Sequence, residues 1–229
     1  MAAIRTVSET GSTNDDLAAL ARDGAPEGLW LRAERQSGGK GRQGRVWQSP
    51  PGNLYASTLV RVDPRHPPPP SLALVAAVAL HEAVSRYTPR ARIKWPNDIT
   101  ISRAKLAGIL LERQADAVVI GFGVNLAHHP ENLERPTASL AALIGSAPDP
   151  AVFLADLADT FARWLGRWRG EGLAPLRARW LQRAHPIGSA LRTSDGDGLF
   201  EGLDQDGALL LRRADGRIET IRAGDVFLL

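Results

Sequence analysis

Apolar residues recur at helical spacing in several parts of the chain, and this periodicity predicts the helices. Ser12 or Thr13 can cap a helix that runs through 14–21, with acidic residues in its first turn. The stretch 71–87 is apolar nearly all round in its first half, which predicts a buried helix packed against a sheet. Three more helices are expected at 138–144, 151–169 and 175–183.

Short runs of β-branched and aliphatic residues predict the strands. In the main part of the chain they lie at 29–34, 54–60, 92–95, 99–101, 106–112 and 118–124. From Gly188 onward the chain changes to short β-like segments at 189–193, 199–203, 208–212, 217–221 and 226–229. These segments are typical of a small barrel. A unit of about 42 residues is marginal on its own, so we expect it to pack on the main domain.

Length and composition indicate one large domain with a small appendage. The chain has 229 residues, 44% of them apolar and 23% charged, close to the averages for soluble globular proteins. The absence of cysteine excludes disulfides, thiol nucleophiles and cysteine-type zinc sites, and fits a reducing compartment. The amino end has no signal-peptide core, and the longest aliphatic run, 72–80, is far shorter than the roughly 20 residues of a membrane span. We therefore expect a cytoplasmic protein without a membrane anchor.

The basic residues are divided unevenly between arginine and lysine. The net charge is only +3, which is too small and too spread to indicate wholesale coating of nucleic acid. Of the 28 basic residues, 25 are arginine and three are lysine: Lys40, Lys94 and Lys105. Lysine is a compact point charge that arginine does not replace at every site. The three lysines therefore mark segments to examine for chemistry.

A long irregular segment, 36–52, follows the first predicted strand, and we call it the glycine-rich loop. Its glycines let the backbone approach a ligand, while Lys40, Arg42 and Arg45 supply cations suited to phosphate oxygens. Without an anion these charges repel one another, so we expect the loop to be mobile when empty and ordered by its ligand. The alternatives are a solvated basic linker and a single-stranded nucleic-acid loop with Trp47 as a stacking platform.

The same loop matches two nucleotide-binding patterns that its context excludes. Residues 39–44 fit G-x-G-x-x-G, but Pro50 and Pro51 prevent the helix that a dinucleotide-binding turn must open. With Val46 the run also fits a kinase glycine loop, yet the sequence contains neither H-R-D-L-x-x-x-N nor D-F-G.

Three further segments lie at strand ends, where a sheet presents side chains to a cleft. The segment 94–98 (KWPND) ends a strand, although Asn and Asp serve turns more often than chemistry. The segment 105–112 begins with a lysine and holds Gly108, where a ligand can come close. The segment 121–125 (GFGVN) ends the next strand in the same way. By contrast, the pair at 128–129 (HH) lacks the partners of a metal site.

Five segments in this order and spacing resemble the biotin protein ligases, also called biotin–[acetyl-CoA-carboxylase] ligases. They are 12–14 (STN), 36–47 (QSGGKGRQGRVW), 94–98 (KWPND), 105–110 (KLAGIL) and 121–125 (GFGVN), and the resemblance covers nearly the whole chain. It implies a two-step reaction with biotin and ATP as substrates and Mg²⁺ as cofactor. Biotin and MgATP would form biotinyl-5′-adenylate and pyrophosphate, and a lysine of a biotin carboxyl carrier protein would then attack the mixed anhydride.

The resemblance also implies roles for individual residues. The catalytic set would be Lys105, Arg42, Arg45 and Asp98, with Asp98 either helping with Mg²⁺ or orienting the incoming amine. The biotin-binding set would be Ser12, Thr13, Gln36, Gly39, Lys40 and Gly108. The set that binds ATP and the adenylate would be Arg42, Arg45, Trp47, Asn97, Lys105 and Asn125. Lys40 stands where the family has an arginine, so its side chain carries less weight than Arg42 or Arg45.

The fold that the resemblance implies is α+β. A mixed sheet flanked by helices, as in class II aminoacyl-tRNA synthetases, would occupy 1–184, and a small SH3-like β-barrel 185–229. The glycine-rich loop would close over the adenylate and keep water away from it. Larger family members carry an amino-terminal DNA-binding domain that represses transcription, but this chain begins close to Ser12. We therefore expect an enzyme that binds no DNA and is not a repressor, while a homodimer stays open.

Two other functions remain as alternatives. A lipoate or octanoate ligase is the nearest alternative enzyme, but its R-R-x-x-G-G-G-x-V-x-H-D signature is missing. A basic nucleic-acid-binding module is the alternative from a different class, and it would leave Lys105 and the expected biotin-binding set unexplained.

Overall fold

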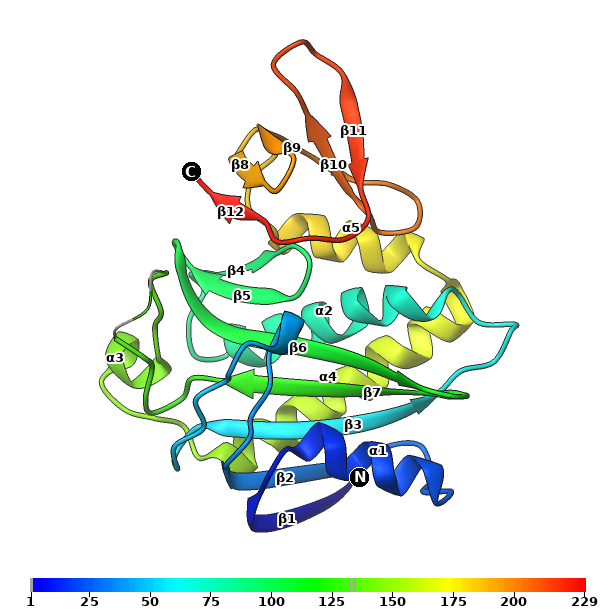
Figure 1. Cartoon of the computed structure of the whole chain (residues 1–229), viewed down its shortest axis with the longest axis vertical. Coiled ribbons are helices and arrows are strands. Elements are labelled where there is room, and N and C mark those ends of the chain that lie inside the picture. The colour runs from blue at the N-terminus through cyan, green and yellow to red at the C-terminus, as the bar shows by residue number, and fades with distance from the viewer. Residues whose placement is uncertain (1, 132, 134) are drawn as a thin grey trace.

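The computed structural model describes residues 2–131, 133 and 135–229, and its centre is a seven-stranded sheet (Figure 1). The strands are β1 (Ala3–Thr10), β2 (Leu29–Gln36), β3 (Leu54–Arg61), β4 (Ala91–Lys94), β5 (Asp98–Ile101), β6 (Ala104–Gln114) and β7 (Ala117–Val124). Their order is β1-β2-β3-β7-β6-β5-β4. The β1–β2 pair is parallel and the other pairs are antiparallel, so the predicted mixed sheet is confirmed.

Helices cover both faces of this sheet. In Figure 1, α1 (Thr13–Arg22) lies in front of the sheet, whereas α2 (Leu72–Ser85) and α4 (Pro150–Glu171) lie behind it. The helix α5 (Ala174–Arg183) packs against α2, α4 and β4, and a short helix, α3 (Leu140–Ile144), follows the sheet. Each predicted helix is therefore present, with ends that differ by a few residues. No helix in the described part of the chain is long and apolar enough to cross a membrane.

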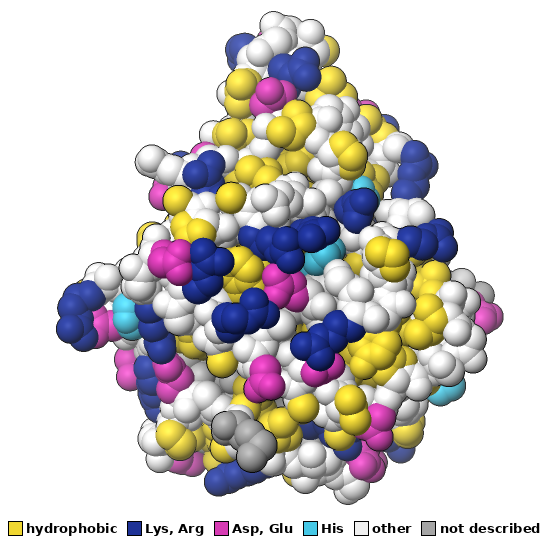
Figure 2. Space-filling view, turned by 180° about the vertical axis from the view of Figure 1, so that it is seen from behind, with side chains coloured by type: hydrophobic (Ala, Val, Ile, Leu, Met, Phe, Trp, Pro, Cys, Tyr) yellow, Lys and Arg dark blue, Asp and Glu magenta, His cyan; other side chains and the backbone are white. Residues whose placement is uncertain are grey.

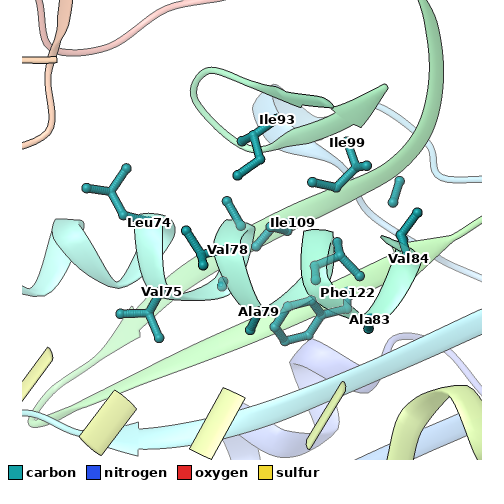
Figure 3. Packing of buried hydrophobic residues seen from close by; sticks show 14 of the residues in the cluster. Leu74, Val75, Val78, Ala79, Ala83, Val84, Ile93, Ile99, Ile109 and Phe122 are labelled. Atoms are coloured by element: carbon teal, nitrogen blue, oxygen red, sulfur yellow. The ribbon is translucent and has the colours of Figure 1, made fainter. Parts of the chain in front are cut away.

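The helix α2 forms the centre of the larger core. Figure 3 shows its side chains, among them Val78 and Ala79, beside Ile109 and Phe122 of the sheet. Fully burying a side chain such as Val78 or Ile109 contributes about 1.5–3 kcal/mol. This packing confirms the buried helix that the all-round apolar pattern predicts.

The strand β1 has no counterpart in the sequence-based prediction. It lies at the edge of the sheet, and most of its residues are exposed. An edge strand with exposed side chains needs no alternation of apolar and polar residues, so it leaves little signal in the sequence. Its parallel register with β2 follows from the crossover through α1, which places Thr10 opposite Gln36.

The C-terminal segment forms a second, antiparallel sheet, consistent with the predicted SH3-like domain. Its strands are β8 (Ala190–Thr193), β9 (Gly196–Leu203), β10 (Leu209–Arg212), β11 (Ile218–Ile221) and β12 (Phe227–Leu228), in the order β11-β10-β9-β8-β12. It packs on the main domain as expected, with the Trp180 and Phe200 rings 6.2 Å apart and Trp95 Nε1 donating to the Gly207 carbonyl at 3.2 Å. The exact boundary between 184 and 185 stays a prediction.

Candidate active site

A cavity of about 830 Å³ lies where α1, the glycine-rich loop, the sheet and the C-terminal segment meet. This volume is typical of a small-molecule site. Most of the predicted site residues line it: Ser12, Thr13, Gln36, Lys40, Arg42, Arg45, Trp47, Asn97, Asp98, Lys105, Gly108 and Asn125. Lys94 lines it as well, so the three lysines of this arginine-rich chain all border one cavity.

The ring of Trp47 lies against two glycines of the sheet. A Cβ atom on Gly123 would lie 2.6 Å from Trp47 Cε2, and one on Gly108 would lie 3.2 Å from Cζ3. Nζ of Lys105 is 5.3 Å from the centroid of the same ring, within cation–π range. The indole N–H is buried against the sheet and finds no acceptor among the described residues.

One end of the cavity is polar but uncharged. Oε1 of Gln36 accepts hydrogen bonds from the Thr13 backbone N–H at 2.8 Å and lies 3.1 Å from Thr13 Oγ1. Nε2 of Gln36 donates to Ser49 Oγ at 3.2 Å, which fixes the orientation of the amide. Ser12 is one of the two capping residues that the sequence offered for α1, and it takes the N-cap position without a capping hydrogen bond from its side chain.

The opposite end of the cavity holds a buried carboxylate between two ammonium groups. Oδ1 of Asp98 is 2.7 Å from Lys105 Nζ, and Oδ2 is 3.2 Å from Lys94 Nζ. Burial alone would raise the pKa of Asp98, but the nearby charges of Lys105 and Lys94 outweigh it and keep this pKa below its usual value. Asp98 is therefore ionised, and the cluster as a whole carries one net positive charge.

The two arginines of the glycine-rich loop meet the C-terminal domain. Arg45 pairs with Asp225 at 2.7 Å, and Arg42 lies 3.6 Å from the same carboxylate. Arg42 also donates to the Gly224 carbonyl at 3.1 Å and to Asn97 Oδ1 at 3.4 Å. The loop thus crosses the cavity from α1 to the C-terminal sheet.

Two predicted biotin-binding residues, Gly39 and Lys40, make contacts within the protein that differ from the predicted contacts with biotin. Gly39 is buried and does not line the cavity, and a Cβ atom on it would lie 2.5 Å from the Trp47 carbonyl oxygen. The geometry gives Gly39 a packing role in the loop. Lys40 lines the cavity, but its Nζ pairs with Asp15 Oδ2 at 2.6 Å, and this hydrogen bond raises the pKa of Lys40.

The amides of Asn97 and Asn125 both bond to backbone. Nδ2 of Asn97 donates to the Ile109 carbonyl at 2.6 Å, and Nδ2 of Asn125 donates to the Ala138 carbonyl at 3.1 Å. Each therefore joins two segments of the cavity wall. Their expected contacts with the adenylate stay predictions.

The predicted site residues did not include Lys94, Ser57, Glu112, Asn14 or Asp225, all of which contact residues of the site. Asn14 belongs to the motif at 12–14, so this motif could have indicated that Asn14 lies at the site. Ser57 and Glu112 lie within predicted strands, where a polar residue usually indicates an exposed position. Asp225 lies in a Gly-Asp pair that is typical of a turn.

The described residues contain no group of three or more His, Cys, Asp or Glu side chains placed to hold a metal ion. His129 Nδ1 instead lies 3.0 Å from Ser139 Oγ, and His128 lies at the start of the loop after β7. The side chains that line the cavity include organic cations, neutral polar groups, the Trp47 ring and the carboxylates of Asp98 and Asp225. Such a site suits a ligand with an uncharged polar head and an anionic or phosphorylated end.

The fold and this division of the cavity define a protein of the biotin and lipoate ligase class. Residues 10–125 match the model of the biotin/lipoate A/B protein ligase family, and the chain belongs to that family. Residues 193–229 match the biotin protein ligase C terminal domain.

The most similar proteins include biotin ligases. The chain is 40% identical to a biotin–[acetyl-CoA-carboxylase] ligase of Paracoccus denitrificans, over 96% of this chain and 98% of the relative. It is 34% identical to a biotin–[acetyl-CoA-carboxylase] ligase of Mycobacterium tuberculosis, over 96% of this chain and 86% of the relative. The solved biotin protein ligase from Aquifex aeolicus in complex with biotin and ATP shares the fold, with a TM-score of 0.89, 24% identity and full coverage of both chains. These matches confirm the family inferred from the five segments.

Proposed function

We propose that this protein activates biotin with MgATP to biotinyl-5′-adenylate and then transfers biotin to a lysine of a biotin carboxyl carrier protein. One observation carries the proposal: a single cavity joins the neutral end around Thr13 and Gln36 to the cationic end around Lys105. The uncharged ureido group of biotin suits the first end. The carboxylate of biotin and the phosphates of ATP suit the second.

The first step brings two anions together. A carboxylate oxygen of biotin attacks the α-phosphorus of ATP, and the bond from that phosphorus to the oxygen of the β-phosphate breaks to release pyrophosphate. Cations held in place before the reaction stabilise the negative charge of this transition state. Lys105 would contact the carboxylate and α-phosphate oxygens, Arg42 the adenylate, and Arg45 the departing pyrophosphate.

Asp98 would act by positioning Lys105. Asp98 is 7% exposed, and its ion pairs with Lys105 and Lys94 hold both ammonium groups at the cavity wall. A lysine whose charge is held in a buried ion pair loses less conformational freedom when it meets a phosphate. Orientation of the incoming amine would be a second role for Asp98, because its Oδ1 lies 2.7 Å from Lys105 Nζ, which is expected to contact the carboxylate of biotin.

Direct coordination of Mg²⁺ by Asp98 does not fit this geometry. Both oxygens of the carboxylate face ammonium groups at 2.7 and 3.2 Å, so a divalent cation there would meet two like charges. Magnesium usually keeps several waters and binds through substrate phosphates. Magnesium therefore enters this proposal only as part of the MgATP substrate.

The second step consumes the adenylate. The neutral ε-amine of the acceptor lysine attacks the carbonyl carbon of the anhydride, an amide bond forms, AMP leaves, and the amine loses a proton to solvent. Until the carrier arrives, the glycine-rich loop would limit access of water to the anhydride. A homodimer is possible by the resemblance to the family and is untested. Sedimentation analysis with and without ligands would test it.

Exchange of labelled pyrophosphate into ATP tests the first step. We expect exchange that depends on biotin and is absent with octanoate or lipoate. Transfer of labelled biotin to a purified carrier domain tests the second step. Exchange with lipoate but not with biotin would overturn the proposal in favour of the alternative ligase.

The distribution of surface charge supports an enzyme over a nucleic-acid-binding module. On the face seen in Figure 2, basic and acidic side chains interleave. Many arginines are paired, and Arg163 and Arg179, for example, both contact Glu82. A surface that tracks a phosphate backbone needs unpaired cations. A steep, linear loss of log affinity for plain DNA or RNA with log salt concentration would favour the module instead.

A further inference from the structure

A chain of polar side chains runs from the far side of β6 to the neutral end of the cavity. Glu112 Oε2 accepts from Asn14 Nδ2 at 2.7 Å, and Asn14 Oδ1 accepts from Ser57 Oγ at 2.6 Å. Ser57 Oγ is in turn 2.7 Å from Thr13 Oγ1. Thr13 lines the cavity, whereas Ser57 is fully buried behind it.

The chemistry of these groups allows one arrangement of the protons. An ionised carboxylate can only accept, so Glu112 must face the NH₂ group of Asn14. The amide oxygen of Asn14 then faces Ser57, and the single hydroxyl proton of Ser57 must point to it. The short contact between Ser57 and Thr13 therefore requires Thr13 to be the donor.

This arrangement of protons determines what the Thr13 hydroxyl offers to a ligand in the cavity. The Thr13 hydroxyl proton has two acceptors within reach, Gln36 Oε1 at 3.1 Å and Ser57 Oγ at 2.7 Å. The shorter contact requires it, because Ser57 gives its own proton to Asn14. The Thr13 oxygen is left with free lone pairs and no proton for the cavity. It can accept a hydrogen bond from a ligand but cannot readily give one.

We propose that Glu112, Asn14 and Ser57 are positioning residues that hold the Thr13 hydroxyl as an acceptor and thereby select a ligand with an N–H group at this point. This inference rests on the proposed function, in which that ligand is the ureido ring of biotin. If the ligand ring had an oxygen in place of this N–H, that oxygen and the Thr13 oxygen would both be acceptors, and no hydrogen bond could form between them. A site built to pair a polar group discriminates strongly against a ligand that lacks it.

The space around Asn14 shows that the chain has little freedom to rearrange. A Cβ atom on Gly121 would lie 2.3 Å from Asn14 Oδ1, so only glycine leaves room for this amide. Asn14 is 4% exposed and Ser57 is fully buried, so the hydrogen bonds between them have no solvent competitor.

The test compares biotin with its two cyclic carbamate analogues, in which oxygen replaces one or the other ureido N–H. Biotin-dependent pyrophosphate exchange gives kcat/KM for each compound, and the analogue that the unchanged protein rejects more strongly is used. In Ser57→Ala the Thr13 proton keeps only the longer 3.1 Å contact to Gln36 and can turn to the ligand. We expect the preference for biotin over the carbamate to fall at least five-fold, with KM for biotin rising and kcat changing little.

Two further variants separate positioning from structural damage. Glu112→Gln keeps the volume but offers both a donor and an acceptor to Asn14, so both proton arrangements become available, and the preference should fall less than in Ser57→Ala. Thr58→Val removes the neighbouring buried hydroxyl, which bonds to the Leu29 carbonyl at 3.1 Å and points to the other face of β3. It should leave the preference unchanged.

Equal losses for biotin and the carbamate in both Ser57→Ala and Glu112→Gln would overturn the inference. If Ser57→Ala fails to fold, Glu112→Gln alone decides. Absence of biotin-dependent exchange in the unchanged protein would instead overturn the proposed function.

Discussion

Arg45 and Asp225 form an ion pair of 2.7 Å between residues 180 positions apart in the sequence. The same carboxylate lies 3.6 Å from Arg42, so one acidic side chain of the C-terminal domain contacts both arginines of the glycine-rich loop and offsets one of their two positive charges. These are the arginines proposed to contact ATP. Phosphate oxygens would compete with Asp225 for the same guanidinium groups.

Replacing Asp225 should therefore change ATP binding. In Asp225→Asn the arginines lose their protein counter-charge, and we expect KM for ATP in the exchange assay to fall by up to about five-fold, since partly exposed ion pairs contribute up to about 1 kcal/mol. Asp197→Asn is the matched control, because it breaks an exposed pair with Arg192 elsewhere in the same domain. A rise in KM for ATP would mean that Asp225 orients the arginines for phosphate and does not compete with it.

Removal of the charge of Lys105 should nearly abolish the first step. We expect Lys105→Ala to reduce pyrophosphate exchange by several hundred-fold, as for other preorganised charge contacts. Loss of a partner also leaves Asp98 paired with Lys94 alone, so thermal unfolding must be measured alongside. Arg113→Ala is the control and should retain activity, because Arg113 is an exposed cation on the same strand whose side chain makes a local contact to the Ala115 carbonyl. Full activity in Lys105→Ala would remove this residue from the mechanism.

Gly123 should tolerate no side chain because of the Trp47 ring. In Gly123→Ala the new Cβ would lie 2.6 Å from the indole, which must move away from the sheet. We expect kcat/KM in the exchange assay to fall about 10- to 100-fold, in line with misplacement of a positioning group. Gly166→Ala in α4 has no atom within 4 Å of its Cβ, and should keep activity and gain about 0.5–1 kcal/mol of stability. Unchanged kinetics in Gly123→Ala would show that the position of Trp47 is unimportant.

Stability should decrease in mild acid because of His81. Burial lowers the pKa of His81 to about 4, against 6.5 for the unperturbed side chain, although its hydrogen bond to the Ala91 carbonyl acts in the opposite direction. Between these values the unfolded chain binds more protons, so the free energy of unfolding should fall as the pH drops from about 6.5 to 4, by up to about 3 kcal/mol.

Urea denaturation at several pH values measures this effect. His81→Gln should reduce the pH dependence in that range. Part of the pH dependence should remain in both His81→Gln and the unchanged protein because of His185. Burial and the charges of Lys94 and Arg92 also lower the pKa of His185 to about 4. An identical slope for His81→Gln and the unchanged protein would contradict the assignment.

Local sequence patterns were sufficient for most of the fold. The apolar run that became α2 and the short β-branched runs that became β5–β7 have periodicities set by burial on one or both sides. The edge strand β1 was not predicted, because its exposed side chains show no periodic pattern of apolar residues. The scarcity of lysine marked the segment around Lys94 for examination, and the structure places Lys94 in the cavity wall.

The identity of the family and most residues of the cavity followed from the amino-acid sequence alone, because motifs of a few neighbouring residues carry the chemistry and the turns that expose it. Tertiary structure alone decided which distant groups meet: Asp225 with Arg45, Glu112 with Asn14, and Ser57 with Thr13. It also decided that Gly39 packs inside the loop and does not line the cavity. The physical reason is that hydrogen bonds and ion pairs depend on distances in space, which the packing of the whole chain sets and a local pattern does not contain.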